Sequence, residues 1–260
     1  MEGMKVYCMY NGLNKNAPMG ALIKTDDPTA KIDFPSWTVF IKHPEVNILF
    51  DAASHKLPER QLPFIMKDLI LKKGDTPPER IREIGLEPED VDILLMSHLH
   101  CDHIGYLDAF PNAKIMVHED EFTYSMRDYG LGTLAAKLDM KHYIDCQLNW
   151  ELVPNNFQTK ELFEGITLYN FGVGHSYGLL GLMLDLPKDG KKFLVGDALY
   201  CAEFLENPDL QPGTCYDFEN SQKTQEYIKQ VVAETGAEIW FGHDLAQVNS
   251  LKKSSEGYYE

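Results

Sequence analysis

Short apolar runs separated by turn residues dominate the hydrophobic pattern of the chain, and amphipathic stretches are fewer. Runs of this length predict buried strands, because helices in soluble domains are usually longer. We expect strands at residues 4–10, 37–42, 46–50, 93–96, 114–117, 150–154, 166–171, 179–186, 192–195 and 238–241. The pair Asp189-Gly190 lies between two of them and predicts a hairpin turn. The pattern therefore indicates a sheet-rich chain with helices between strands.

Helix signals fall in the intervals between these strands. Thr76, followed by two prolines and then by Glu79, has the form of a helix start with a capping box. Pro63 delays or disrupts any helix in residues 59–73. Further helices are predicted from Gly105-Tyr106 onward and over residues 119–127, 131–143 and 221–235.

Two longer intervals allow a functional or a structural interpretation. Residues 11–36, which contain Gly, Asn and Pro, form either an active-site rim or a surface loop, and the loop is favoured. Residues 128–149 interrupt the series of strands, and Leu131, Leu134 and Leu138 give the helix within them an amphipathic face. This interval is either a lid over a substrate pocket or ordinary packing.

Composition and charge narrow the class of protein. The 260 residues are 44% hydrophobic and 25% charged, as in ordinary soluble enzymes, and no repeat or linker divides residues 1–260, so one domain is expected. The net charge of −16 opposes nucleic-acid partners. No apolar run approaches the ~18 residues of a membrane span, and no secretory signal is visible. Five scattered cysteines without a CxxC motif fit a reducing cytoplasm.

A small molecule is the partner that this composition favours. Neither a membrane nor a nucleic acid is expected to bind, and the chain is either a monomer or a homodimer.

Four potential metal ligands follow one buried strand within six positions. The segment reads D-I-L-L-M-S-H-L-H-C-D-H-I-G and contains His98, His100, Asp102 and His103. Imidazole and carboxylate groups are costly to remove from water, and few apolar side chains nearby offset that cost. In the H-x-H pair the two rings lie two positions apart on extended backbone and point to one side. The cluster therefore predicts a site for zinc or a similar ion.

Other predicted strands end in further candidate ligands. His175, Asp197 and His243 each follow a glycine, which permits tight turns and close backbone approach. Ligands at one end of a layered sheet converge on a single site. Asp51, after another strand, either orients a ligating histidine or caps the turn. His118 shows no ligand spacing and is interpreted as structural.

The motifs HLHCDH, GVGHSYG, GDALY and FGHD resemble the metallo-β-lactamase superfamily, and most of all its N-acyl-homoserine lactonase branch. The resemblance covers roughly residues 35–245. It implies an α/β fold of the αβ/βα four-layer type, with two mixed β-sheets flanked by helices. It also implies two ions, with zinc favoured and iron, manganese or cobalt as alternatives. By position, His98, His100 and His175 would hold the first ion, Asp102, His103 and His243 the second, and Asp197 both.

The same resemblance implies the chemistry of ester hydrolysis. A water shared by two cations loses a proton near neutral pH, so the expected activity is opening of the ring of N-acyl-homoserine lactones or related lactones. Tyr200 matches a tyrosine that stabilises the oxyanion and orients the substrate, and a packed aromatic residue is the structural alternative. Asp102 is expected to relay a proton to the leaving alkoxide. Cys101 stands where related lactonases carry an aromatic residue of the acyl pocket, so the motif does not predict which acyl chain fits.

Other activities of the superfamily are the alternatives. A glyoxalase II-like thioesterase shares all seven ligands, but it binds glutathione through basic residues near the C-terminus, where only Lys252-Lys253 qualifies. A phosphodiesterase or tRNA-processing nuclease conflicts with the charge of −16. A class B β-lactamase lacks the bridging aspartate, and a di-iron oxygen or nitric oxide reductase tends to carry a carboxylate at the position of His100. A non-catalytic binding module is least favoured, because all seven ligands are present.

Overall fold

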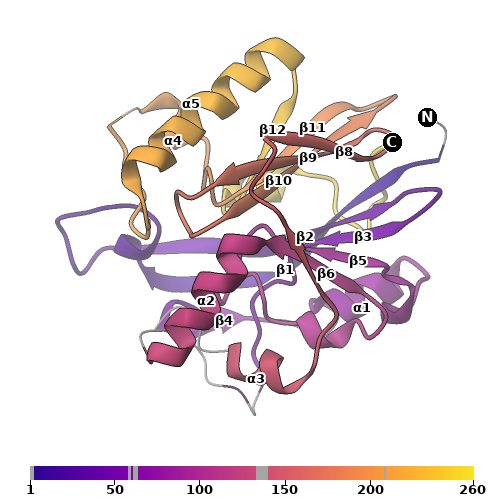
Figure 1. The fold of residues 1–260 in the computed structure, drawn as a ribbon, viewed down its shortest axis with the longest axis horizontal. Helices are drawn as coiled ribbons and strands as arrows, with labels where there is room; N and C mark the ends of the chain where they lie inside the picture. The colour runs from indigo at the N-terminus through magenta and orange to yellow at the C-terminus, as the bar shows by residue number, and fades with distance from the viewer. Residues whose placement is uncertain (1–2, 58–59, 61–63, 133–139, 208) are drawn as a thin grey trace.

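Two sheets packed face to face form the centre of the molecule. The structure is a computed structural model, and it describes all residues except 1–2, 58–59, 61–63, 133–139 and 208. Helices cover the outer face of each sheet (Figure 1). The expected four-layer αβ/βα arrangement is therefore confirmed. Among the described residues, no helix has the length and apolar character needed to cross a membrane.

The bounds of the elements follow from the backbone. The first sheet contains β1 (Lys5–Pro18), β2 (Lys31–Lys42), β3 (Asn47–Phe50), β4 (Asp68–Ile70), β5 (Ile93–Leu95), β6 (Lys114–His118) and β7 (Trp150–Val153). The second contains β8 (Thr159–Phe163), β9 (Ile166–Gly172), β10 (Leu179–Leu186), β11 (Gly190–Gly196) and β12 (Glu238–Phe241). The α-helices are α1 (Pro77–Glu83), α2 (Glu119–Leu131), α3 (Met140–Asp145), α4 (Glu203–Glu206), α5 (Phe218–Thr235) and α6 (Leu245–Ser250). Short 3-10 turns are η1 (Met19–Ala21), η2 (Phe64–Met66), η3 (Pro88–Asp90) and η4 (Leu107–Ala109).

The strand order brings parallel strands to the edge where the candidate ligands lie. The first sheet has the order β4-β1-β2-β3-β5-β6-β7, and β3, β5, β6 and β7 run parallel. The second has the order β12-β11-β10-β9-β8, in which β11 and β12 form the parallel pair. Parallel strands end at the same edge of a sheet, where loops meet and sites are commonly built. The segments that follow β5, β11 and β12 are therefore brought close together.

Every second residue of a central strand faces the interior between the sheets. Val39 and Ile41 of β2 lie in that interior, while Phe40 between them packs on the opposite face. In the second sheet Leu182 of β10 faces the interior and Met183 packs on the side of α5. Burial of such side chains contributes about 25 cal/mol per Å² of apolar surface and holds the sheets together.

Several helix starts and turns lie where local sequence signals predicted them. Thr76 Oγ1 accepts from the backbone N–H of Glu79, and the Glu79 carboxylate accepts from the Thr76 N–H, so the capping box is confirmed. The helix predicted over 119–127 is confirmed and extends to Leu131. The hairpin at Asp189-Gly190 joins β10 to β11 as expected.

The prediction that residues 11–36 form a loop was wrong except for residues 19–30, which connect β1 to β2. β1 continues to Pro18 and pairs with β2 through two irregularities in register, which interrupt the alternation of apolar residues. The buried Asn11 makes the polar pattern resemble a loop. Its Nδ2 donates to the carbonyl of Asp75 over 2.7 Å, and its Oδ1 accepts from the Thr38 hydroxyl over 2.9 Å. Both partners are distant in sequence, so the pattern alone did not reveal them.

One helix prediction was wrong, and two others agree with the structure only in part: η2 follows Pro63 as a short, late turn, and α3 covers the end of the range 131–143. Gly105 donates its N–H to the carbonyl of Ala53, and the chain there forms only η4 where a helix was expected. Residues 59–73 contain η2 and β4, while 59 and 61–63 lie outside the described part. Leu131 ends α2, because Gly132 adopts a left-handed φ of 69°, so no helix starts there. The rest of the predicted amphipathic face lies among residues 133–139, outside the described part.

Candidate metal centre and active site

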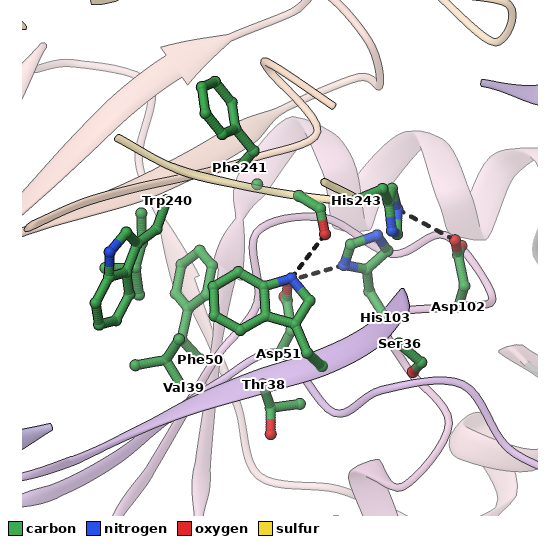
Figure 2. Close-up of a pocket in the computed structure, with 14 residues that line it drawn as sticks. Ser36, Thr38, Val39, Phe50, Asp51, Asp102, His103, Trp240, Phe241 and His243 are labelled. Atoms are coloured by element: carbon green, nitrogen blue, oxygen red, sulfur yellow. Dashed lines mark hydrogen bonds and ion pairs between the residues drawn. The ribbon is translucent and has the colours of Figure 1, made fainter. Parts of the chain in front are cut away.

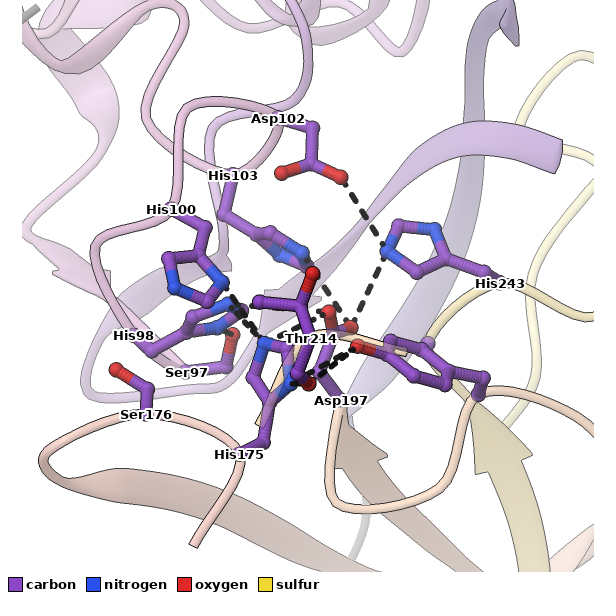
Figure 3. A network of polar contacts seen from close by, with 12 residues as sticks. Ser97, His98, His100, Asp102, His103, His175, Ser176, Asp197, Thr214 and His243 are labelled. Carbon is purple, nitrogen blue, oxygen red and sulfur yellow. Dashed lines mark hydrogen bonds and ion pairs between the residues drawn. The ribbon is translucent and has the colours of Figure 1, made fainter. Parts of the chain in front are cut away.

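Loops at one edge of the two sheets bring the seven predicted ligands together (Figure 3). The loop after β5 carries His98, His100, Asp102 and His103, and His175, Asp197 and His243 follow β9, β11 and β12. All of them are buried except His100, which is partly exposed. The convergence expected from the strand ends is therefore present in the structure.

The first group of donor atoms belongs to His98, His100, His175 and Asp197, all within 4.8 Å of one another. His175 Nε2 lies 3.2 Å from His98 Nε2 and 2.8 Å from His100 Nδ1. Asp197 Oδ2 lies 3.3 Å from His175 Nε2. Three imidazole nitrogens and a carboxylate that face one common point form a donor set suited to one ion.

The second group comprises Asp102, His103 and His243. His243 Nε2 lies 3.5 Å from Asp102 Oδ2 and 3.2 Å from Asp197 Oδ1. His103 Nε2 lies 3.4 Å from the same Asp197 oxygen. Asp197 thus presents one oxygen to each group, as Figure 3 shows, and this is the geometry of a bridging carboxylate.

Two buried polar atoms of this set lack normal hydrogen bonds, and this indicates whether the set is suited to metal ions. His103 Nε2 and Asp197 Oδ1 are buried, and neither makes a hydrogen bond of normal geometry; their contacts are ion pairs of 3.2 and 3.4 Å. An unpartnered buried polar atom is costly, so a native structure normally supplies a partner. A divalent ion between the donors of each group would supply it, and nitrogen and carboxylate ligands suit zinc and similar metals. The residues therefore fit a dinuclear centre.

Burial and charge give the two groups different protonation. In the first group, burial lowers the pKa of His98 and of His175, which keeps both rings neutral and able to bind metal. In the second group burial acts in the same direction but is outweighed by nearby carboxylates. Asp197 is the foremost of these carboxylates, and together they raise the pKa of His103 and of His243. An ion that enters the second group must displace protons.

Asp51 stands behind the second group. Its Oδ2 lies 2.8 Å from His103 Nδ1, and its two oxygens also accept from the N–H and the hydroxyl of Ser97. A carboxylate that accepts a hydrogen bond from the Nδ1–H of a histidine turns the Nε2 atom of that ring toward the centre. Of the two interpretations offered for Asp51, the structure supports orientation of a histidine.

Backbone carbonyls orient two further histidines. His175 Nδ1 lies 2.9 Å from the carbonyl of Thr214, and His243 Nδ1 lies 3.2 Å from that of Pro35. Phe34 packs edge-on against the His243 ring with 4.9 Å between centroids. Part of the 11–36 interval therefore forms a wall of the site, which is the alternative that the sequence did not favour.

Tyr200 lies against this centre with its side chain buried. The hydroxyl is 2.9 Å from His175 Nδ1 and 3.3 Å from the Thr214 carbonyl. Burial, followed by the charges of Asp197 and Asp102, raises the pKa of Tyr200 well above its usual value. The hydroxyl therefore stays protonated and is a hydrogen-bond donor near the metal-facing histidines.

Glu121, on α2, is a residue that the sequence analysis missed. It is fully buried, and one carboxylate oxygen accepts from the N–H of Leu99 over 2.9 Å. The other accepts from the N–H groups of Tyr177 and Gly178 and from the hydroxyl of Ser176. The carboxylate thus ties the His98–His100 segment to the loop that carries His175. A glutamate on the buried face of a helix was the available signal, but it does not reveal those partners.

Two other residues singled out in the sequence have clear positions. His118 caps α2, because its Nδ1 accepts from the Asp120 N–H over 3.1 Å. Its ring fills the space beside Gly178, where an added Cβ would come within 2.1 Å of Nδ1. The structural interpretation of His118 is confirmed. Cys101 is buried, with 2% of its surface exposed.

A small cavity lies between the sheets behind the second group (Figure 2). His103, His243 and Trp37 are among the residues that line it, and the Trp37 indole donates to the carbonyl of Gly242 over 2.8 Å. Its volume of about 20 Å³ is enough for a single water molecule. A cavity of this size does not admit a substrate.

Comparisons with known proteins identify N-acyl homoserine lactonases as similar chains. N-acyl homoserine lactonase AiiB of Agrobacterium fabrum is 36% identical over 186 residues, which cover 70% of this chain and 67% of the relative. N-acyl homoserine lactonase AiiA of Bacillus thuringiensis subsp. kurstaki is 28% identical over 235 residues, which cover 86% of this chain and 87% of the relative.

Solved structures give the same picture. A quorum-quenching N-acyl homoserine lactone lactonase matches with a TM-score of 0.81 and 26% identity over 97% of each chain. An N-acyl homoserine lactone hydrolase with the product N-hexanoyl-L-homoserine at its catalytic metal centre matches with a TM-score of 0.80. Its identity is 25%, over 97% of this chain and 98% of that one. The sequence model of the Metallo-beta-lactamase superfamily matches residues 32–243, and the chain belongs to this superfamily.

Proposed function

We propose that this protein is a dinuclear metal hydrolase that opens the lactone ring of N-acyl-homoserine lactones. The observation that carries the proposal is Asp197, whose two oxygens face two separate donor groups. The relatives named above support the substrate class. We further propose zinc as the ion, the cytoplasm as the compartment and the whole chain as one catalytic domain.

The chain's own residues supply positioning and proton transfer. When bound, two divalent ions would lower the pKa of a shared water and polarise the lactone carbonyl. Asp102 lies beside His243 and is placed to take the proton of the attacking water. It then returns that proton to the ring oxygen as the C–O bond breaks. The products of this step are a carboxylic acid and an alcohol on one open-chain molecule, and the acid releases its proton to solvent to become a carboxylate.

Tyr200 acts at the carbonyl oxygen in this scheme. Its hydroxyl remains protonated, so it donates a hydrogen bond to the negative charge that develops on the carbonyl oxygen. Its contact with His175 keeps the hydroxyl beside the first group. Rotation away from the Thr214 carbonyl frees it for the substrate.

The thioesterase alternative loses its main support in the structure. Lys252 Nζ donates to the carbonyl of Tyr258 over 2.8 Å, and Lys253 Nζ donates to the carbonyl of Leu251 over 2.6 Å. Each ammonium group thus already has a backbone partner. Binding of glutathione would compete with these hydrogen bonds.

Hydrolysis of a series of acyl-homoserine lactones by zinc-loaded protein tests the proposal. We expect zinc-dependent ring opening with kcat/KM above ~10⁴ M⁻¹s⁻¹, within the usual range of enzymes. A thioester of glutathione and a simple phosphodiester serve as comparison substrates. Faster turnover of either one, or no lactone turnover by protein that carries both ions, would overturn the proposal.

A further inference from the structure

A third cluster of metal-ligand side chains lies outside the dinuclear centre. It consists of Asp108 in η4 and of His142 and Cys146 at the end of the α3 region, and its donor atoms lie within 4.8 Å of one another. His142 Nε2 is 2.6 Å from Asp108 Oδ2 and 3.6 Å from Cys146 Sγ. Histidine and cysteine four positions apart share one face of a helical turn, so both can face the same ion.

The distance between Cys146 and His142 suits a tetrahedral ion. Zinc–sulfur and zinc–nitrogen bonds of about 2.3 and 2.0 Å place the two ligand atoms ~3.5 Å apart at a tetrahedral angle. The observed 3.6 Å between Cys146 Sγ and His142 Nε2 matches that value. The shorter Asp108 contact is a hydrogen bond that an ion would replace. Two donor atoms of the dinuclear centre also lie closer together than they would around an ion: the nitrogens of His175 and His100 are 2.8 Å apart.

We propose that Asp108, His142 and Cys146 form a third metal site that takes zinc or a similar divalent ion. A carboxylate and a thiolate together neutralise the two charges of the ion, and a neutral imidazole completes a mixed O, N and S donor set that suits zinc. The Asp108 and His142 side chains are 31% and 36% exposed, so an ion can enter from solvent. Water fills the fourth position.

The ion would fasten α3 to the segment that follows the dinuclear ligands. Tyr143, next to His142, is fully buried, and its hydroxyl donates to the carbonyl of Ile104, which directly follows His103. The Arg60 guanidinium covers the Tyr143 ring, 4.7 Å from its centroid. One side of α3 is thus held by Tyr143, and the third site would hold the other side.

Cobalt titration of metal-free protein tests this site apart from the dinuclear centre. The dinuclear donors are nitrogen and oxygen only, so a thiolate-to-cobalt charge-transfer band reports a cysteine ligand. We expect three ions per chain and a thiolate band in the unmodified protein. Cys146→Ser should abolish the band and leave two ions, while the control Cys201→Ser, at a partly exposed cysteine outside the donor groups, should retain the band and all three ions. His142→Ala should weaken the third ion by more than the ~10–100-fold that is typical for residues behind the ligands.

Three results would overturn the third site. They are two ions and no thiolate band in the unmodified protein, three ions without that band, and a band that survives Cys146→Ser. Cys146 is exposed, so its change to serine should not prevent folding, and circular dichroism checks this. Lactone turnover plays no part in the readout, so failure of the proposed lactonase activity would leave this test intact.

Discussion

The two donor groups share Asp197 but are held by different means. In the first group burial keeps His98 and His175 neutral, and the buried carboxylate behind the group, Glu121, acts through backbone N–H groups of the loops. The second group contains a carboxylate of its own, and Asp51 touches His103 directly. The first group is thus positioned by hydrogen bonds from the loop backbone to Glu121, and the second by the direct contact of a carboxylate with a ligand histidine.

This difference affects how the site would load. The neutral rings of His98 and His175 accept an ion without releasing protons, whereas His103 and His243 are held protonated until an ion replaces those protons. We therefore expect the second ion to be the more sensitive to pH and to the charge of nearby carboxylates.

Removal of the shared carboxylate should have the largest effect. Asp197→Asn leaves the shape of the side chain but removes the charge that faces both groups, and several kcal/mol of transition-state stabilisation depend on the ions. We expect kcat/KM for the lactone to fall by about 10³-fold or more. Both ions should also bind more weakly, as measured by metal analysis after desalting. Asp26→Asn, at an exposed position, is the control. Near-normal activity with two ions bound would refute the bridging role.

Loss of the Tyr200 hydroxyl should separate catalysis from ion binding. Tyr200→Phe keeps the ring against His175 and His243 and removes only the donor. We expect kcat to fall by about 10²-fold with both ions retained, as for loss of one oxyanion donor. The control is Tyr216→Phe, whose side chain is exposed. An unchanged kcat would leave Tyr200 with only a packing role.

The two buried carboxylates should affect different ions. Asp51→Asn should weaken the second ion by about 10–100-fold and spare the first, because Asp51 contacts His103. Competition with a chelator measures both affinities, and Asp185→Asn on the exposed side of β10 is the control. Equal weakening of both ions would remove the distinction between the groups.

Glu121→Gln should act on stability and on the first group. An amide cannot accept all the hydrogen bonds that the carboxylate receives, so we expect a loss of about 1–3 kcal/mol in the free energy of unfolding. Urea unfolding measures this loss, and Asp120→Asn on the same helix serves for comparison. Unchanged stability together with an unchanged first ion would contradict the bridging role of Glu121 between the two loops.

The smallest expected effect is on the pH dependence of stability. Without ions, the raised pKa values of His103 and His243 stabilise the folded state below the unfolded value of about 6.5. That contribution is lost as the pH rises through the raised values in the folded protein. The increase in Tm on zinc addition should therefore grow with pH. If the zinc-induced increase in Tm became smaller as the pH rises, His103 and His243 would not be protonated in the metal-free protein.

The ligand set could be predicted because its signals are local. His98 to His103 lie within one loop after one buried strand, and the glycines before His175 and Asp197 mark strand ends in the sequence itself. The sheet order then brings these ends together, as in other layered α/β proteins. Short-range pattern and strand topology were therefore sufficient to bring these side chains to one edge, whereas their division into two groups came from the family resemblance.

The features that were not predicted depend on distant partners. Asn11 lies in a strand because Asp75 and Thr38 satisfy it, and neither is near it in sequence. Glu121 binds two loops that lie before and after it along the chain. A polar residue in isolation resembles a loop or a surface position, so these roles require the tertiary structure.

Turnover as a function of bound ions tests the central claim most directly. N-hexanoyl-homoserine lactone hydrolysis would be followed while zinc is added to metal-free Cys146→Ser protein, so that only the dinuclear centre is counted. We predict little activity with one ion per chain and full activity when the second binds. Full activity with one ion or with none, or no activity with two, would contradict a dinuclear lactonase.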